Sequence, residues 1–562
     1  MSFLPDNFKI SNWDNLKPYY ESLLEREVGN EQQLKQWFQD RSDLESAISE
    51  DLAWRYIKMS CNTNDPNLQE DYEYFLTEIQ PHLSNFDHQL NQKVLNSPFH
   101  QNIKEEPYLI MLRHLKNSFD LFREENIPLQ TEEQKKAKEF SRISGAMAVT
   151  IDGEEMTLQQ AGKLLESNHR AKRESAWMAI NERRIKDKDK INVLLDDLMS
   201  IRHQIALNSG FENYRDYKFR ALGRFDYTRE DVFDFHKAIS SEVVPLLDLT
   251  ASKRKEKMEL GVIRPWDNQA DPDGLDPLKP FDTSKEFLEK SIKAFGKIDQ
   301  EMGSVLETMD QMGHFDLESR KGKAPGGYNY PLAQSGYPFV FMNASGTLRD
   351  LVTLMHEGGH AVHSVLTKDL HLLNFKHPGS EVAELASMSM ELISMDHWNE
   401  FFEDAPSLKR AKINHLEQVI ETLPWVAIVD KFQHWIYENP NHTHEERAIA
   451  WSGIFNEFSD NIVSWEGLEI YKNHLWQKQI HIFEYPFYYI EYGMAQLGAI
   501  ALWKNYKDDP VQALSNYKKA LSLGNTTSIP GIYEAAGIKF DFSRDYISQL
   551  MAFVKEELKS LY

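Results

Sequence analysis

Apolar residues recur three or four positions apart along most of the chain, and this spacing predicts amphipathic α-helices. The segment 34–52 is typical, with apolar side chains at Leu34, Trp37, Phe38, Leu44, Ala47, Ile48 and Leu52. Segments with the alternating pattern of β-strands are few. The sequence therefore predicts a mainly α fold that includes a small β-sheet.

Two segments have the pattern of strands. Residues 147–151 alternate apolar and polar positions and end at the Asp-Gly dipeptide 152–153, which is favoured in tight hairpin turns. Thr157 and Gln160 follow with the spacing of a capping box, which predicts that a helix begins there. The second segment, 336–343, is rich in aromatic and β-branched residues.

The length of 562 residues exceeds the size at which one hydrophobic core stops growing, so we expect at least two lobes. We predict an N-terminal helical lobe at 1–205 and a catalytic lobe at 206–562, with the boundary somewhere within 110–210. The segment 264–282 contains four prolines and several Asp and Gly residues, which exclude regular helix and indicate an ordered loop.

Composition narrows the classes of partner. The formal net charge of −24 is spread along the chain and opposes binding to nucleic acid or anionic lipid. The single cysteine, Cys61, cannot form an internal disulfide, which favours a reducing compartment and a small core position for this residue. No segment approaches the roughly 18 to 20 apolar residues needed to cross a bilayer, and the N-terminus lacks the pattern of a secretory signal. We therefore expect a cytoplasmic protein without membrane or nucleic-acid partners.

The segment 350–366 contains the pattern that carries chemistry. His356 and His360 stand four positions apart, with Glu357 beside the first. On a helix with about 3.6 residues per turn, residues four apart share one face, so both imidazoles can reach one zinc ion. Glu357 lies about 100° round the helix, where its carboxylate can take a proton from zinc-bound water and pass it to the leaving amine.

A helix that carries this pattern by coincidence is the alternative. Gly358 and Gly359 argue against it, because a glycine inside a helix costs about 1 kcal/mol relative to alanine and a purely structural helix has no reason to carry two. Close approach of backbone or substrate would explain both glycines. The apolar residues on either side of the motif predict that the helix is buried.

A catalytic zinc ion takes three protein ligands and leaves a position for water. His363 shares the histidine face but lies about 10 Å along the axis from the first motif histidine, so it fits packing or an outer position better. After a loop, Ser380 is a candidate N-cap for a second helix that offers Glu381, Glu384 and Glu391 near one face. Spacing alone does not choose among the three, since Glu381 could serve the helix dipole and Glu391 could orient a histidine.

The chain resembles the thimet oligopeptidase and oligoendopeptidase F group of zinc metallopeptidases. HEGGHAVH at 356–363 fits the HExGHxxH form, and ELASMSME at 384–391 fits the ExxSxxxE helix of that family. The stretches SGAMAVTIDGEEMTL, GYPFVFMNASGTLRD, LPWVAIVDKFQHWIYENP and HIFEYPFYYIEY extend the resemblance over most of the chain. The resemblance selects Glu384 as the third ligand. It also implies one Zn²⁺ per chain and an elongated multi-helical body, with a short sheet lining a deep channel that admits unfolded peptides.

Phenols and one imidazole gather towards the C-terminus, at His481, Tyr485, Tyr488, Tyr489 and Tyr492. Such groups can donate hydrogen bonds to the oxyanion of a tetrahedral intermediate, although ordinary packing of half-buried aromatic side chains is the alternative. The resemblance favours His481, Tyr489 and Tyr492 as catalytic groups, with Tyr492 at the oxyanion, and Tyr485 as a substrate-binding residue.

Further substrate contacts are expected around the second strand segment. An exposed strand edge there could pair with an extended peptide, and a buried strand is the alternative. We expect contacts from Gly336, Tyr337 and Phe339, and the resemblance adds Gly326 and Gly327 in a glycine-containing loop.

Taken together, the sequence predicts a zinc-dependent endopeptidase for short unfolded oligopeptides. His356, His360 and Glu384 would hold the metal, and Glu357 would act as general base. A carboxypeptidase or dipeptidyl carboxypeptidase on the same scaffold is one alternative, and a catalytically inactive peptide-binding protein is another. A monomer is favoured.

Overall fold

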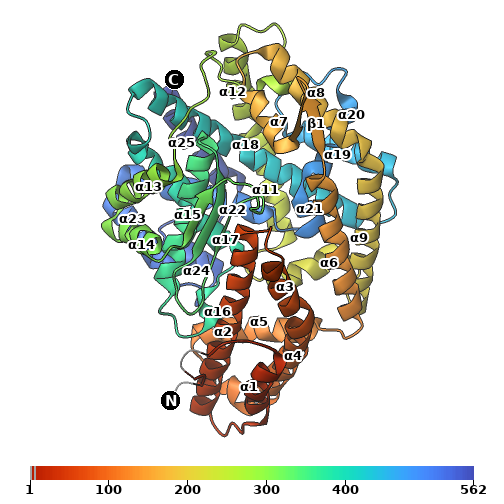
Figure 1. Ribbon diagram of the computed structural model, residues 1–562, viewed down its shortest axis with the longest axis vertical. Helices are drawn as coiled ribbons and strands as arrows, with labels where there is room; N and C mark the ends of the chain where they lie inside the picture. Colours follow the sequence, from red (N-terminus) through yellow and green to blue (C-terminus); the bar gives the residue numbers. More distant parts are fainter. Residues whose placement is uncertain (1–2, 6–7) are drawn as a thin grey trace. The chain divides into compact units, whose positions relative to one another are not determined.

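Helices dominate the computed structural model, which describes residues 3–5 and 8–562 (Figure 1). The mainly α class predicted from apolar spacing is confirmed. The chain divides into two compact units, each assembled from separate segments. Unit 1 comprises the described residues through Leu121 together with Lys279–Leu408 and Gly498–Phe540; unit 2 comprises Phe122–Leu278, Lys409–Leu497 and Asp541–Tyr562.

The N-terminal part of unit 1 is a group of helices around one apolar core. Its longer helices are α1 (Trp13–Glu25), α2 (Glu31–Cys61), α4 (Gln80–Asn96) and α5 (Glu106–Leu121). The amphipathic segment 34–52 lies inside the single helix α2, and its residues Leu34, Trp37 and Leu44 are fully buried. Burial of these side chains stabilises α2 more than helix propensity alone would.

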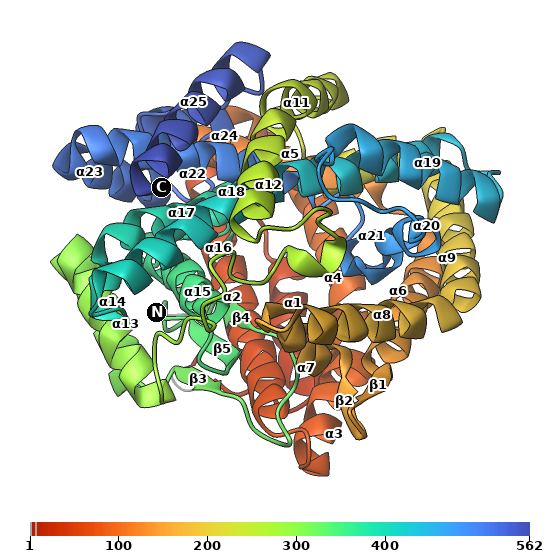
Figure 2. The ribbon, with the colours of Figure 1, turned by 90° about the horizontal axis from the view of Figure 1, so that it is seen from above.

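The second part of unit 1 contains a three-stranded sheet beside helices. The strands are β3 (Phe315–Glu318), β4 (Tyr328–Tyr330) and β5 (Phe339–Ala344), and the helices include α13 (Ser284–Ile298), α14 (Gln300–Gln311), α15 (Leu348–Thr367) and α17 (Ser380–Ile393). The strand order is β3-β5-β4, with β3 parallel and β4 antiparallel to the central β5 (Figure 2). The strand predicted at 336–343 begins three residues late, because Gly336 adopts a φ of 71° in a turn.

Unit 2 contains the predicted hairpin and the helix that follows it. Strands β1 (Ala148–Ile151) and β2 (Glu154–Thr157) pair antiparallel through a turn in which Asp152 and Gly153 have φ values of 54° and 85°. Positive φ at both central residues suits the right-handed twist of a two-residue hairpin. Thr157 and Gln160 form the predicted capping box of α7 (Leu158–Lys163).

The other helices complete the two units. In unit 2 they include α6 (Asn126–Gly145), α8 (Arg170–Lys186), α9 (Lys188–Asn208), α10 (Tyr214–Ala221), α11 (Arg229–Glu242), α12 (Val244–Lys257), α19 (His444–Phe458), α20 (Glu469–Lys472), α21 (Ile480–Glu484) and α25 (Arg544–Leu561). In unit 1 they include α3 (Pro66–Tyr74), α16 (Leu373–Lys376), α23 (Pro510–Ser522) and α24 (Ile529–Ala535). Helices α18 (Ala405–Glu438) and α22 (Ile490–Asp508) each contribute residues to both units.

The segment 264–282 is an ordered loop, as predicted, with a single short helical turn at Pro265–Asp267. Asp267 fixes it, because its buried carboxylate accepts hydrogen bonds from the guanidinium groups of Arg170 and Arg173. The limits of the two units do not coincide with a single boundary near residue 205, since both units are discontinuous in the chain. Cys61 is partly buried, and not the core residue expected.

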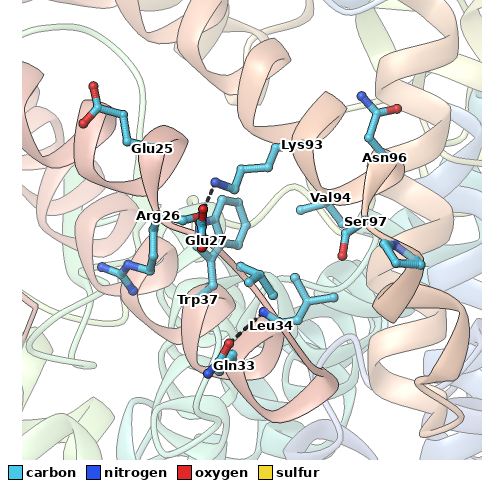
Figure 3. A pocket seen from close by; sticks show the side chains of 13 residues that line it. Glu25, Arg26, Glu27, Gln33, Leu34, Trp37, Lys93, Val94, Asn96 and Ser97 are labelled. Atoms are coloured by element: carbon cyan, nitrogen blue, oxygen red, sulfur yellow. Dashed lines mark hydrogen bonds between the residues drawn. The ribbon is translucent and has the colours of Figure 1, made fainter.

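Across the part of the chain that is described, no helix is both long and apolar enough to span a membrane. A pocket of about 810 Å³ lies in unit 1 among α1, α2 and the end of α4 (Figure 3). Lys93 donates hydrogen bonds there to the carbonyls of Leu24 and Arg26, which satisfies the C-terminal end of α1. None of the residues that line this pocket has a role predicted from the sequence.

Candidate metal centre

Helix α15 carries the HEGGH motif and begins at a well-formed cap. The side chain of Thr347 accepts from the backbone of Asp350, and the Asp350 carboxylate accepts in return from the Thr347 N–H. This capping box fixes the first turn of the helix. Leu351, Leu354 and Met355 are fully buried, so the apolar flank of the motif faces the core, as its sequence predicts.

The two glycines of the motif are explained by close packing. A Cβ atom on Gly358 would lie 2.4 Å from Cζ of Phe295 in α13. A Cβ atom on Gly359 would lie 2.6 Å from Cα of Ser387 and 2.7 Å from the carbonyl oxygen of Ala386, both in the backbone of α17. Side chains at these positions would therefore force α15 away from its neighbours. The close approach of backbone expected from the sequence is present.

Helix α17 begins one residue earlier than predicted. Gly379 is its N-cap, and Ser380, the expected cap, is the first helical residue and makes no capping hydrogen bond. Glu381 and Glu384 are both buried, and Glu391 is partly buried two turns further along. Because glycine has no side chain, Gly379 cannot cap the first turn of α17 with a side-chain hydrogen bond. The sequence pattern therefore does not mark this start of the helix.

His356, His360 and Glu384 are brought together in unit 1. Glu384 Oε2 lies 3.3 Å from Nε2 of His356 and 3.6 Å from Nε2 of His360, and the three candidate ligand atoms all lie within 4.8 Å of one another. Two imidazoles and one carboxylate are the donor set of many catalytic zinc sites. The arrangement can therefore hold a metal ion between two helices that pack directly against each other.

Glu391 contacts the other nitrogen of the first histidine. Its Oε1 lies 2.6 Å from Nδ1 of His356. A proton on Nδ1 shared with this carboxylate leaves Nε2 unprotonated and directed towards Glu384, which is the tautomer a metal needs. Burial lowers the pKa of His356, but Glu384 and Glu391 outweigh that effect and raise its pKa well above the ordinary value, so a metal ion that binds Nε2 has to displace a proton there.

Glu357 lies beside the cluster in a dry environment. The residue is buried, and burial raises the pKa of its carboxyl group to about 7, with Glu384 and Glu391 adding to the rise and His356 opposing it. A carboxylate with a pKa near neutrality can both accept and return a proton. Asn329, a residue that sequence reasoning did not single out, donates from Nδ2 to the carbonyl oxygen of Glu357 at 3.1 Å and so ties β4 to this turn of α15.

His363 is close in sequence but is not part of the cluster of ligand atoms. It is buried, and desolvation lowers its pKa to about 3, so the imidazole is neutral near pH 7. This is the packing position expected from its distance along the helix axis.

The strand segment expected to contact substrate is only partly accessible. Strand β5 pairs with β3 on one side and β4 on the other, so it offers no free edge, and the prediction of an edge there is wrong. Phe339 is buried against Trp54 and His314, and its contact with substrate stays a prediction. The physical reason is that both edges of β5 are paired with strands from other segments, and the residues of β5 alone do not show which segments pair with it. The outer strand of this sheet on the α15 side is β4.

The remaining predicted contact residues flank these strands. Gly326 has a φ of 97°, and a Cβ atom on Gly327 would lie 3.3 Å from the carbonyl oxygen of Phe341, so both positions suit glycine. Gly336 has a φ of 71°, and Tyr337 is partly buried. Their roles in binding substrate remain predictions.

The aromatic cluster predicted near the C-terminus is present in unit 2. The His481 ring centroid lies 4.7 Å from that of Tyr489, 5.9 Å from Tyr492 and 6.0 Å from Tyr485, and Tyr485 is half exposed. These residues therefore form one group around His481. The His–Glu cluster belongs to unit 1, and catalytic roles for the aromatic group remain predictions.

Comparison with known proteins adds independent information. A sequence model described as peptidase family M3 matches residues 163–552, and one described as the peptidase M3 N-terminal domain matches residues 3–122. The second match ends where the first segment of unit 1 ends. An oligoendopeptidase F homolog of Lactococcus lactis subsp. lactis (strain IL1403) is 22% identical over 504 residues, covering 88% of this chain and 79% of the relative. Oligopeptidase PepF of Bacillus subtilis (strain 168) is 23% identical over 69% of this chain and 57% of its own length.

Solved structures give the same picture of the fold. A structure described as PZ peptidase A with inhibitor 2 is 25% identical and has a TM-score of 0.91, covering 99% of both chains. Oligoendopeptidase-F from Enterococcus faecium is 18% identical with a TM-score of 0.65, covering 98% of this chain and 97% of the other.

Proposed function

Because this chain belongs to peptidase family M3, it is a metalloendopeptidase, and we propose that, like the oligoendopeptidase F relatives that it resembles, it cuts internal bonds of short unfolded oligopeptides and uses zinc to do so. The observation that supports this proposal best is the His356–His360–Glu384 cluster with Glu357 beside it. The names of the relatives support the substrate class.

The donor set fits zinc. Two imidazole nitrogens and one carboxylate oxygen suit a borderline-soft ion, whereas magnesium or calcium would favour oxygen ligands throughout. His356, His360 and Glu384 would hold the ion, and Glu391 would keep His356 in the ligating tautomer. When bound, zinc would supply Lewis acidity towards water and the scissile carbonyl group.

Glu357 would carry the proton. Its carboxylate would accept a proton from the attacking water molecule and then deliver it to the nitrogen of the leaving amine. Burial holds the pKa of the group at about 7, so the carboxyl group can both accept and release a proton near neutral pH. Tyr492, with Tyr489 and His481, would donate hydrogen bonds to the developing oxyanion, and Tyr485 would contact the peptide.

The variant Glu357→Gln tests the role of this carboxylate. Glutamine keeps the size of the side chain but cannot accept a proton, so we expect turnover to fall by about 10²-fold or more while zinc content remains near one per chain. Turnover is measured with a fluorogenic peptide, and zinc by atomic absorption. Full activity in the variant would exclude Glu357 as the base.

The pattern of products separates the alternatives. A mixture of peptides of about 5 to 40 residues, incubated with and without a zinc chelator and read by mass spectrometry, should show chelator-sensitive internal cuts with the longest peptides spared. Removal of residues from the C-terminus would indicate a carboxypeptidase or dipeptidyl carboxypeptidase instead. Binding without cleavage would indicate an inactive peptide-binding protein.

We also propose that the protein is cytoplasmic and monomeric. The lone cysteine and the peptide substrates expected of this family are compatible with a reducing compartment. Light scattering coupled to gel filtration measures the mass in solution, and a value near 65.6 kDa is expected.

A further inference from the structure

The loop between α21 and α22 carries three of the tyrosines in an unusual turn. The N–H of Tyr488 donates to the carbonyl oxygen of Tyr485 at 3.2 Å, which closes a β-turn over Pro486 and Phe487. Phe487 has a φ of 65°. A proline at the second position and positive φ at the third match a type II turn, in which the third residue is normally glycine. A phenylalanine in this conformation is strained, and surrounding contacts must hold it there.

Two buried side chains bind the peptide groups of the strained residue. Gln433, from α18, accepts a hydrogen bond through Oε1 from the Phe487 N–H at 2.7 Å. Arg224, from the segment between α10 and α11, donates to the carbonyl oxygen of Phe487. Both side chains lie in unit 2, as does the turn. The backbone N–H and the carbonyl oxygen of Phe487, which belong to the two successive peptide groups on either side of its Cα, are thus fixed from two different elements.

The same arginine ties the turn to the start of α22. Its guanidinium group also donates to Oε1 of Glu491 at 2.8 Å, and both side chains are almost fully buried. Glu491 lies in the first turn of α22, one residue before Tyr492. A buried ion pair of this kind is strongly destabilised when one partner is removed, so it resists rearrangement.

The ring of Phe487 supplies the third anchor. It is fully buried and packs against His434 and Tyr437, with centroid distances of 5.3 and 5.4 Å. Glycine would relieve the backbone strain but would provide no such anchor. Burial of the ring therefore accounts for the choice of phenylalanine at a position that favours glycine.

The tyrosines on either side of the anchor are less buried than its ring. Tyr485 is half exposed, Tyr488 and Tyr489 are partly buried, and all three rings lie beside His481. The path of the backbone sets the point from which each of these side chains extends. The direction of Tyr485 therefore depends on the turn that Gln433, Arg224 and the buried ring hold in place.

We propose that Gln433 and Arg224 are positioning residues for peptide hydrolysis: they clamp the backbone N–H and carbonyl oxygen of Phe487 and thereby present the tyrosines of this turn to the substrate. The inference rests on the proposed function, because it assumes that these tyrosines act on a peptide. It assigns a role to two residues that neither transfer a proton nor attack the substrate in the reaction itself.

The variants Gln433→Met and Arg224→Met test the clamp. Methionine keeps most of the volume of the replaced side chain but makes no such hydrogen bond to the N–H or the carbonyl oxygen of Phe487. Hydrogen exchange followed by mass spectrometry should show faster exchange in a fragment that spans 485–491. The value of kcat/KM for a fluorogenic peptide should fall by about 10- to 100-fold, because small misplacements of a reacting group have effects of that size. Zinc content should stay unchanged.

Arg447→Met is the matched control. Arg447 is a buried arginine of the same unit, and it binds His442, Asn192 and Asp196 and makes no contact with the turn. It should lower thermal stability to a similar extent without changing exchange in 485–491. If Arg224→Met does not fold, Arg224→Lys keeps a charge for Glu491 while losing the planar fork, and the same two measurements apply.

A double mutant separates positioning from general damage. Tyr485→Phe removes one hydroxyl group that the clamp would present. When Gln433→Met is added to Tyr485→Phe, kcat/KM should therefore fall by less than about 3-fold further. Three results would each overturn the proposal. The first is a double variant whose fall in kcat/KM equals the product of the falls in the two single variants. The others are unchanged hydrogen exchange in 485–491 and full activity of both clamp variants. Failure of the proposed function is a different result, since the wild-type chain itself would then release no internal peptide products.

Discussion

Glu391 shows how one carboxylate determines what a neighbouring histidine can bind. By contacting Nδ1 of His356 at 2.6 Å it leaves Nε2 directed towards His360 and Glu384. The sequence offered Glu391 as a candidate for this task among three glutamates on one helix. The contact between Glu391 and Nδ1 of His356 supports this role, and the separation of seven positions along α17, about two helical turns, keeps Glu391 on the same face as Glu384.

Substitution of Glu391 should weaken metal binding. In Glu391→Gln the partner of Nδ1 loses its negative charge, and we expect zinc affinity to fall roughly 10- to 100-fold. Competition with a coloured chelator measures the change. Glu381→Gln, on the same helix but in its first turn, is the control and should leave zinc affinity unchanged. Equal affinities for wild type and Glu391→Gln would contradict the orienting role.

At the scale of elements, the site depends on how closely α15 and α17 approach. Gly359 allows the α15 backbone to touch the α17 backbone at Ala386 and Ser387. This contact places Glu384, one turn before Ser387, beside the two histidines. A larger residue at 359 would separate the ligands as well as the helices.

The variant Gly359→Ala should therefore be costly in spite of the better helix propensity of alanine. Overpacking against backbone should lower the free energy of unfolding by about 1–3 kcal/mol, and zinc affinity should fall with it. Gly453→Ala in α19 is the matched control, because a Cβ atom there would meet nothing within 4 Å. That change should raise the free energy of unfolding by about 0.5–1 kcal/mol. Denaturant titration measures both, and a stabilising Gly359→Ala would show that the helices can move apart freely.

At the scale of the whole molecule, the chain passes repeatedly between two compact units, so neither unit is one continuous stretch of sequence. Each unit has its own buried polar groups. In unit 2, Nε2 of His236 contacts the buried Oδ2 of Asp430 at 2.9 Å, and Nε2 of His434 lies 3.3 Å from the same oxygen. Desolvation lowers the pKa of His236 even though Asp430 opposes this effect.

This buried histidine makes stability depend on pH. The folded protein binds a proton at His236 less readily than the unfolded chain, in which the histidine has a pKa of about 6.5. The unfolded state therefore binds more protons, and the free energy of unfolding should decrease as the pH falls from 7 to 5. Denaturant midpoints across this range should fall less steeply in His236→Gln. An identical pH dependence in the variant would show that other groups control it.

The sequence by itself determined the helical class, the 152–153 hairpin, the Thr157–Gln160 capping box and the HEGGH pattern. Each of these is local, because a few neighbouring residues with fixed spacing set the backbone geometry and the shared face of a helix. That is why His356 and His360 could be paired from their positions alone.

Only the tertiary structure decided which groups meet across elements. It placed Glu384 beside the two histidines, put β5 between two other strands, and brought Gln433 and Arg224 to the backbone N–H and carbonyl oxygen of Phe487. The helix α17 also begins one residue earlier than predicted, with Gly379 and not Ser380 as its N-cap. The physical reason is that burial and hydrogen bonding between distant segments depend on how the chain packs. No short pattern in the sequence specifies which distant segments come into contact.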